Sequence, residues 1–173
     1  ILKDSSTSQE DFFADVKDKL NKIKQNIENN RNNEKNAFYD SKETPKQEND
    51  CRDVVFNKWN DRYSWLAPAT SREKMEANNR VDMNIRCQNP GPYEVQIECK
   101  KDNNKQLKKG IPNQLVKKYF NSQVQYGVYL VFCFEEKTNI QNLEQELEHT
   151  IPEAYQGKIE VICMDLRKPK API

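Results

Sequence analysis

The sequence of 173 residues predicts an α/β fold in which helices flank a mixed four-stranded sheet, with an extra N-terminal helix. Three observations lead to this prediction. Residues 9–28 carry apolar side chains every three or four positions, which is the spacing of one helix face. Residues 80–100 alternate apolar and polar side chains, as half-buried strands do. Residues 126–134 and 158–166 are mostly apolar, which is typical of strands buried on both faces.

Composition limits the classes of protein that the chain can belong to. Its length suits one domain and is short for two. Hydrophobic residues make up 35% and charged residues 32%, which predicts a small core under a highly charged surface. The net charge is +1, so the chain is not a uniformly basic nucleic-acid binder, and any such binding must come from a local concentration of charge.

The five cysteines and the lengths of the apolar runs indicate in which cellular compartment we expect the protein. No two cysteines have the Cys-x-x-Cys spacing typical of zinc sites, and an odd number of them without a signal peptide favours a reducing cytoplasm. No apolar run approaches the roughly 20 residues that a membrane-spanning helix needs. We therefore expect a cytoplasmic protein without a membrane partner. Because the chain begins at Ile1 and continues with the polar stretch DSSTSQED, we expect residues 1–8 to be a linker from a larger polypeptide.

The first helix is predicted over residues 9–28, with Ser8 and Asp11 as a capping pair. Its apolar face consists of Phe12, Phe13, Val16, Leu20, Ile23 and Ile27. This face either packs within the domain or forms a homodimer contact. The helix and the asparagine-rich connection that follows it are assigned to residues 9–43.

The second helix is predicted from Thr44 to about Tyr63, because Thr44 can cap it and Pro45 suits its first turn. Its inward face would carry Cys51, Val55 and Trp59. Glu48 would project from the same face, and a carboxylate on the apolar side of a helix requires a specific partner.

Residues 80–86 and 93–100 are predicted to form a hairpin that collects charge on one face. Val95, Ile97 and Cys99 would point to one side, and Glu94, Gln96, Glu98 and Lys100 to the other. The hairpin can bring Asp82 beside Glu98, and two like charges held together favour a bound cation. Oxygen ligands suit Mg²⁺ or Mn²⁺. Lys100, one pleat further along, would activate water and offset the charge of a phosphate. The alternative is a solvated strand face with ordinary ion pairs.

A run of lysines follows this face. Residues 100–118 contain seven lysines and one aspartate, which gives a local net charge of +6. Such a concentration is typical of a surface that binds a polyanion, although a solvated helix face has the same composition. The expected nucleic-acid contacts are Lys101, Lys105, Lys108, Lys109, Lys117 and Lys118.

Four segments in this order resemble a known family: NNRVDMNI, VQIECKK, NQLVKKY and YGVYLVFCF. Together with PKQENDCRDVV they are similar to the PD-(D/E)xK, or restriction-endonuclease-like, nucleases over about residues 44–134. They look most like the nuclease-like domains appended to larger bacterial proteins, some of them linked to antiviral defence. The resemblance implies a core of helix, three-stranded meander, helix and strand, which we assign to residues 44–168, followed by a tail at 169–173.

The resemblance also implies roles for individual residues. Asp82 and Glu98 would bind the metal together with the carbonyl group of Cys99, and Lys100 would be the catalytic lysine. Gln114 would orient water or phosphate, and Glu48 would contact the metal or its waters.

We therefore expect a Mg²⁺-dependent or Mn²⁺-dependent endonuclease that hydrolyses DNA, as an effector domain of a larger bacterial defence protein. The sequence contains no pattern that separates a DNA substrate from an RNA substrate. One alternative is a catalytically silent module of the same fold that binds nucleic acid or protein. Another is an oligomerisation domain built on the helix at residues 9–28.

Overall fold

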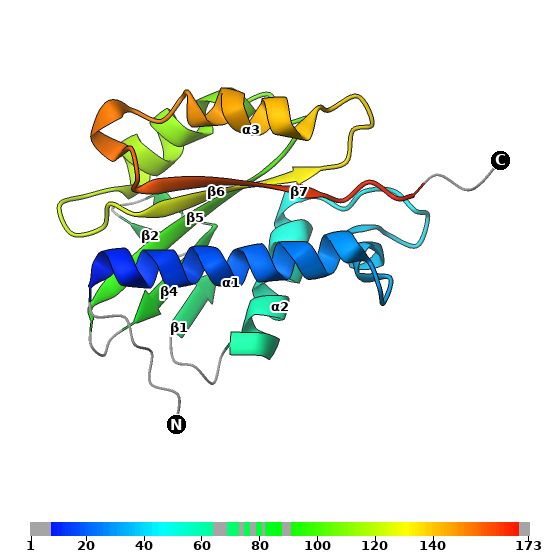
Figure 1. The fold of residues 1–173 in the computed structure, drawn as a ribbon, viewed down its shortest axis with the longest axis horizontal. Coiled ribbons are helices and arrows are strands. Elements are labelled where there is room, and N and C mark those ends of the chain that lie inside the picture. The colour runs from blue at the N-terminus through cyan, green and yellow to red at the C-terminus, as the bar shows by residue number, and fades with distance from the viewer. Residues whose placement is uncertain are drawn as a thin grey trace.

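A mixed β-sheet lies between two layers of helices in the computed structural model (Figure 1). The structure describes residues 8–63, 69–72, 75–76, 79–80, 82–87 and 91–169. Apart from Ser8 and Pro169, the expected linker and tail lie outside these residues. No helix in these ranges is long and apolar enough to cross a membrane.

Helices precede the antiparallel strands, and helices and strands alternate after β5. The helical elements are α1 (Gln9–Asn29), η1 (Glu34–Phe38), α2 (Glu48–Tyr63), η3 (Leu107–Lys109), η4 (Ile111–Tyr119), α3 (Ile140–Glu148) and η5 (Glu153–Tyr155). The strands are β1 (Ala69–Arg72), β2 (Met75–Glu76), β3 (Asn79–Arg80), β4 (Met83–Cys87), β5 (Tyr93–Lys101), β6 (Gly127–Cys133) and β7 (Ile159–Asp165).

The main sheet has the strand order β1-β4-β5-β6-β7. Strands β1, β4 and β5 form an antiparallel meander, whereas β5, β6 and β7 run parallel. The four strands expected from the sequence are β4 to β7, so the prediction of a mixed sheet flanked by helices is confirmed. The short strand β1 adds a fifth strand at the edge. Strands β2 and β3 pair separately.

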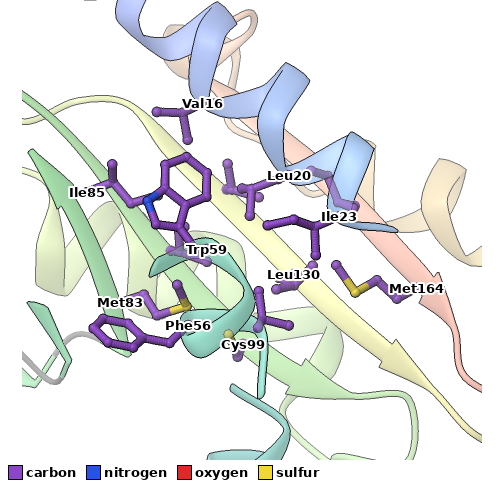
Figure 2. Packing of buried hydrophobic residues seen from close by; sticks show 14 of the residues in the cluster. Val16, Leu20, Ile23, Phe56, Trp59, Met83, Ile85, Cys99, Leu130 and Met164 are labelled. Atoms are coloured by element: carbon purple, nitrogen blue, oxygen red, sulfur yellow. The ribbon is translucent and has the colours of Figure 1, made fainter. Parts of the chain in front are cut away.

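One face of the sheet is covered by α1 and α2 (Figure 1). In Figure 2, Val16, Leu20 and Ile23 of α1 point toward the sheet, where Leu130 and Met164 lie, and Trp59 of α2 fills the space beside them. All six predicted apolar residues of α1 are buried in this core. The suggestion that this face forms a homodimer contact is therefore wrong, because the sheet of the same chain occupies it. The two segments that the sequence analysis assigned separately, residues 9–43 and 44–168, both contribute side chains to this core.

The opposite face of the sheet is covered by η4 and α3, which lie in the two parallel crossovers (Figure 1). Leu107, Ile111 and Leu115 pack there against Tyr129 and Val131 of β6. Strand β6 is consequently buried on both faces along its whole length, which explains its continuously apolar sequence. This second layer covers the side of β5 on which Glu98 and Lys100 lie.

The start of α1 is confirmed and the start of α2 is corrected. The Ser8 hydroxyl accepts a hydrogen bond from the amide of Asp11 at 3.1 Å, as expected for an N-cap. Helix α2 begins at Glu48 and not at Thr44. The amide of Thr44 instead donates to Asp40 Oδ1 at 2.8 Å, in a turn that the bridge between Tyr39 and Pro45 extends. Thr44 is therefore part of this turn and does not lie at the start of α2.

The helical stretch after β5 differs from a regular α-helix. It consists of the 3₁₀ turn η3 and the π-helix η4, with Pro112 at the start of the latter. At the end of η4 the amide of Phe120 donates to the carbonyl oxygen of Leu115 at 2.9 Å, the five-residue spacing of a π-helix. Gln114 and Tyr119, five residues apart, therefore lie about one turn apart along one side of η4.

Candidate functional site

Glu98 and Lys100 form a buried ion pair on β5. Their side chains leave the same face of the strand because they are two residues apart. Only 1% of Glu98 and 5% of Lys100 is exposed. The Lys100 ammonium donates to Glu98 Oε1 and, at 3.2 Å, to the carbonyl oxygen of Cys99. The face is thus charged as predicted, but it is not the solvated strand face of the alternative interpretation.

Asp82 lies beside this pair, as the hairpin register predicted. The last paired residues of the β4–β5 ladder at this end are Met83 and Ile97, and Asp82 occupies a bend just before β4. Its Oδ2 atom accepts a hydrogen bond from the amide of Cys99 at 2.8 Å. The carboxylate of Asp82 therefore continues the hydrogen bonding of β5 where the neighbouring strand has not yet begun.

Glu48, the first residue of α2, reaches the same site from the helix layer. Its Oε1 atom lies 3.7 Å from the Lys100 ammonium. Its Oε2 atom accepts hydrogen bonds from the amide of Lys101 at 2.8 Å and from Asn104 Nδ2 at 2.9 Å. A polar pocket of about 450 Å³ opens beside it, lined by Gln47, Glu48, Lys101, Asn103 and Asn104. Of the candidate acids, Glu48 is therefore the one that borders this pocket.

The charges of the site perturb one another. Burial, together with the negative charge of Asp82, raises the pKa of Glu98 from its usual 4.5 to about 7. Burial also raises the pKa of Asp82, although the Cys99 amide and the charges of Lys100 and Arg52 oppose this. Burial alone would lower the pKa of Lys100, but the attraction of Glu98, Glu48 and Asp82 together outweighs it and the pKa is raised. The site is rich in negative charge that Lys100 does not fully neutralise.

One oxygen of Glu98 lacks a partner. Oε2 is buried and makes no hydrogen bond of standard geometry in the part of the chain that the structure describes. The hydroxyl of Tyr119 is close enough to lower the pKa of Glu98 slightly, and burial together with Glu98 raises the pKa of Tyr119. An unpartnered buried carboxylate oxygen costs free energy, which a cation bound to it would recover.

Gln114 is not brought into hydrogen-bond contact with these groups. It lies on η4, which packs over β5, and its Oε1 atom is buried and has no hydrogen-bond partner among the described residues. The predicted role of Gln114 is therefore supported only by its position on η4, which packs over β5, and not by a direct contact with the other site residues.

The structure adds Arg52, which the sequence analysis did not select. It is 5% exposed and its Nη1 atom lies 3.7 Å from Asp82 Oδ1. The available signal was its position four residues after Glu48, because residues at this spacing share one face of a helix. On α2, Glu48 thus faces Lys100 and Arg52 faces Asp82, so that each helix charge opposes a charge of opposite sign.

The lysines predicted to bind nucleic acid are divided between two locations. Lys101 lies on the other face of β5 from Lys100, and its ammonium donates to the carbonyl oxygen of Lys46 at 3.0 Å and lies 5.0 Å from the centre of the Phe134 ring. The remaining side chains, all exposed on or before η3 and η4, are those of Lys105, Lys108, Lys109, Lys117 and Lys118. Lys108 pairs with Glu146 at 2.7 Å. Five of the six predicted lysines are therefore exposed, and Lys101 lies apart from them.

A metal has oxygen donors available here but no preformed cluster of three acids. Among the described residues, no group of three or more His, Cys, Asp or Glu side chains is arranged to hold a metal ion. The oxygens assigned to the metal are instead shared by protein donors: the Lys100 ammonium contacts Glu98 Oε1 and the Cys99 carbonyl. The position between these two oxygens is thus occupied by the cation of the chain's own lysine.

Comparison with known proteins gives one match. Neither the curated proteins nor the solved structures contain a chain that matches this one. The family model described as a domain of unknown function, DUF8371, matches residues 12–136, which include α1 from Phe12 onward, α2, both strands of the β4–β5 hairpin, η4 and β6. This region contains every candidate site residue discussed above. The chain therefore belongs to the DUF8371 family.

Proposed function

We propose that the domain is a divalent-metal-dependent nuclease of the PD-(D/E)xK type that hydrolyses phosphodiester bonds in DNA. The observation that carries the proposal is the convergence of Asp82, Glu98 and Lys100 with Glu48 of α2 at one end of β5. Two acids and a lysine on adjacent strand ends, with a further acid from a preceding helix, are the residue types that the sequence resemblance requires at these positions.

The order of elements gives additional support. Helix α2 is followed by the meander of β1, β4 and β5, then by η4 and then by β6. This is the order of helix, three-stranded meander, helix and strand that the resemblance implies. Of the proposed site residues, Glu48 also lines a polar pocket, together with Gln47, Lys101, Asn103 and Asn104.

The donor set fits Mg²⁺ or Mn²⁺. Both ions prefer oxygen ligands, and the unpartnered Oε2 atom of Glu98 offers one. Asp82, Glu98 and the carbonyl oxygen of Cys99 would hold the ion, and Glu48 would contact it or its waters. The ion would supply positive charge to the phosphate and lower the pKa of water.

Lys100 would then change partners. Its ammonium now contacts Glu98 and the Cys99 carbonyl, so binding of a metal by these oxygens would release it. The released ammonium can stabilise negative charge that develops on the phosphate or orient the attacking water. Glu48 Oε1, 3.7 Å from Lys100, would retain the lysine near the site.

The exposed lysines around η3 and η4 support a polyanionic substrate. Lys109 and Lys117 are exposed on η3 and η4, and Lys105 is exposed in the turn before η3. Such a surface contributes binding that is independent of sequence and weakens with salt. We infer that it guides DNA to the site, within a larger bacterial defence protein of which this domain is the effector.

Nicking of supercoiled plasmid DNA tests the proposal. The purified domain is incubated with Mg²⁺ or Mn²⁺, with EDTA, and as the variants Lys100→Met and Asp82→Asn. We expect nicking that requires metal and is abolished in both variants, while Lys22→Ala, an exposed lysine of α1, nicks at the wild-type rate. Wild-type activity in Lys100→Met would contradict the assignment of the site.

A second function is favoured by one observation. The acids already have protein donors, since the Cys99 amide holds Asp82, Lys100 holds Glu98, and Lys101 and Asn104 hold Glu48. A catalytically silent module that binds nucleic acid or protein would keep these bonds. It would bind DNA in a salt-sensitive manner without any response to Mg²⁺ or to Lys100→Met.

A further inference from the structure

Arg52 is the least expected member of the site. It is almost completely buried on α2, one turn after Glu48, and burial of an arginine requires compensation by charge. Asp53 contacts its guanidinium, because Nε and Nη2 lie 3.1 and 3.0 Å from Asp53 Oδ1. The third nitrogen, Nη1, is directed to Asp82 Oδ1 at 3.7 Å.

Asp82 depends on side-chain contacts for its orientation. It lies in a bend and not in a strand, so the β4 ladder does not include it. The Cys99 amide holds Oδ2 and the Arg52 guanidinium faces Oδ1, so that the carboxylate lies between the two. Arginine suits this role because it is always charged and its planar group presents donors in a fixed geometry.

We propose that Arg52 is a positioning residue that fixes the carboxylate of Asp82 for phosphodiester cleavage. It acts through Asp82 and does not contact the reacting atoms. Asp53 holds the guanidinium of Arg52, and Arg52 faces Asp82, so the position of α2 determines where the carboxylate of Asp82 lies before β4. This inference rests on the proposed nuclease function, and it identifies a residue on which the geometry of the site depends.

The Cys99 amide provides a signal that is independent of activity. Because this amide donates to Asp82, its resonance in ¹H–¹⁵N spectra and its hydrogen exchange report the position of that carboxylate. We compare Arg52→Met and Arg52→Lys with Arg62→Met, which removes an arginine from the same helix near Glu34. Arg52→Lys keeps the charge and serves as the test if Arg52→Met does not fold.

In Arg52→Met we expect a shifted Cys99 amide resonance, faster exchange, and a nicking rate lower by about 10²-fold, the cost of a misplaced catalytic group. Arg52→Lys should be intermediate in both measurements, and Arg62→Met should match the wild type. An unmoved Cys99 amide in a folded Arg52 variant would overturn the inference, as would a moved amide with unchanged nicking.

The experiment distinguishes a failure of the nuclease proposal from a failure of the role assigned to Arg52. If the wild-type domain does not nick DNA with either metal, the nuclease proposal and the role of Arg52 in cleavage both fail, whatever the amide shows. If the wild type nicks DNA and only the Arg52 result is negative, the nuclease proposal stands and the positioning role is overturned.

Discussion

The Lys100 ammonium contacts the same two oxygen-bearing groups, Glu98 and the carbonyl of Cys99, that the sequence resemblance assigns to a metal ion. Both side chains of the ion pair are buried, on the side of β5 that η4 covers. Removal of one partner from a buried pair leaves an uncompensated charge. In this structure the ammonium of Lys100 supplies the positive charge that compensates Glu98.

The first prediction concerns pH. Glu98 has a usual pKa of 4.5 and a pKa of about 7 in the folded protein, so the folded state binds a proton that the unfolded state has lost. The contribution of this group to stability is fully present below pH 4.5 and is lost as the pH rises through 7. The loss amounts to about 3 kcal/mol in the free energy of unfolding.

Denaturation in urea with EDTA, at pH values from 5 to 8, measures this contribution. The stability of the wild type should fall across this window, whereas Glu98→Gln, which does not titrate, should show a flatter profile. Added Mg²⁺ should stabilise the wild type more at pH 8 than at pH 5.5, because the ion binds the ionised carboxylate. Identical pH profiles for the two proteins would contradict the raised pKa.

A second prediction concerns the layer that covers the site. Gly110 lies between η3 and η4, and a methyl group at this position would overlap the Tyr129 hydroxyl, which donates to the Leu107 carbonyl oxygen at 2.7 Å. Gly110→Ala should lower the free energy of unfolding by about 3 kcal/mol, because the packed tyrosine must move. In Gly157→Ala, where the space is open but φ is +76°, the expected loss is about 1 kcal/mol. Equal losses would exclude the steric explanation.

A third prediction concerns α1. Leu20 is fully buried between α1 and the sheet, so Leu20→Ala should lower the free energy of unfolding by about 2 to 5 kcal/mol. Lys22→Ala, on the exposed side of the same helix, should have little effect. Sedimentation should show the same oligomeric state for both variants and the wild type. A change of oligomeric state in Leu20→Ala would restore the dimer interpretation of this helix.

A fourth prediction separates the two groups of lysines. Lys109→Ala and Lys117→Ala should each weaken DNA binding and reduce the slope of log affinity against log salt by about 1. Lys101→Ala should leave the slope unchanged, because that side chain is directed to Lys46 and Phe134 on the other face of β5. Titration of fluorescent duplex DNA at several salt concentrations measures these slopes. An equal effect of all three substitutions would contradict the division.

Local sequence patterns were sufficient for much of the fold. The apolar spacing of α1 reflects burial of one helix face, and the continuous apolar run of β6 reflects burial of both strand faces. In β5 both faces are buried, and the alternation separates apolar side chains on one face from polar and charged side chains on the other. The same alternation placed Glu98 and Lys100 together. It also placed Lys101 on the opposite face of β5. The prediction that Lys101 binds nucleic acid with the other lysines used only their charge and did not take this alternation into account.

Capping and helix type were less predictable. Thr44 and Pro45 have the composition of a helix start, but the side chain of Asp40 engages Thr44 in a turn, and α2 begins four residues later. The π-helix of η4 had no clear signal beyond Pro112 and Gly110. Such features depend on competition between nearby hydrogen bonds of similar free energy, which residue preferences do not resolve.

The sequence by itself determined the class of the fold, the charged face of β5 and the candidate acids Asp82 and Glu98, because these follow from periodicity along a single strand or hairpin. The tertiary structure decided that Lys100 is paired with Glu98 within a buried layer and that Glu48 and Arg52 of α2 face Lys100 and Asp82. The contacts of Glu48 with Lys100 and of Arg52 with Asp82 join residues about 50 and 30 positions apart, and they exist only once the hydrophobic core has fixed α2 against the sheet.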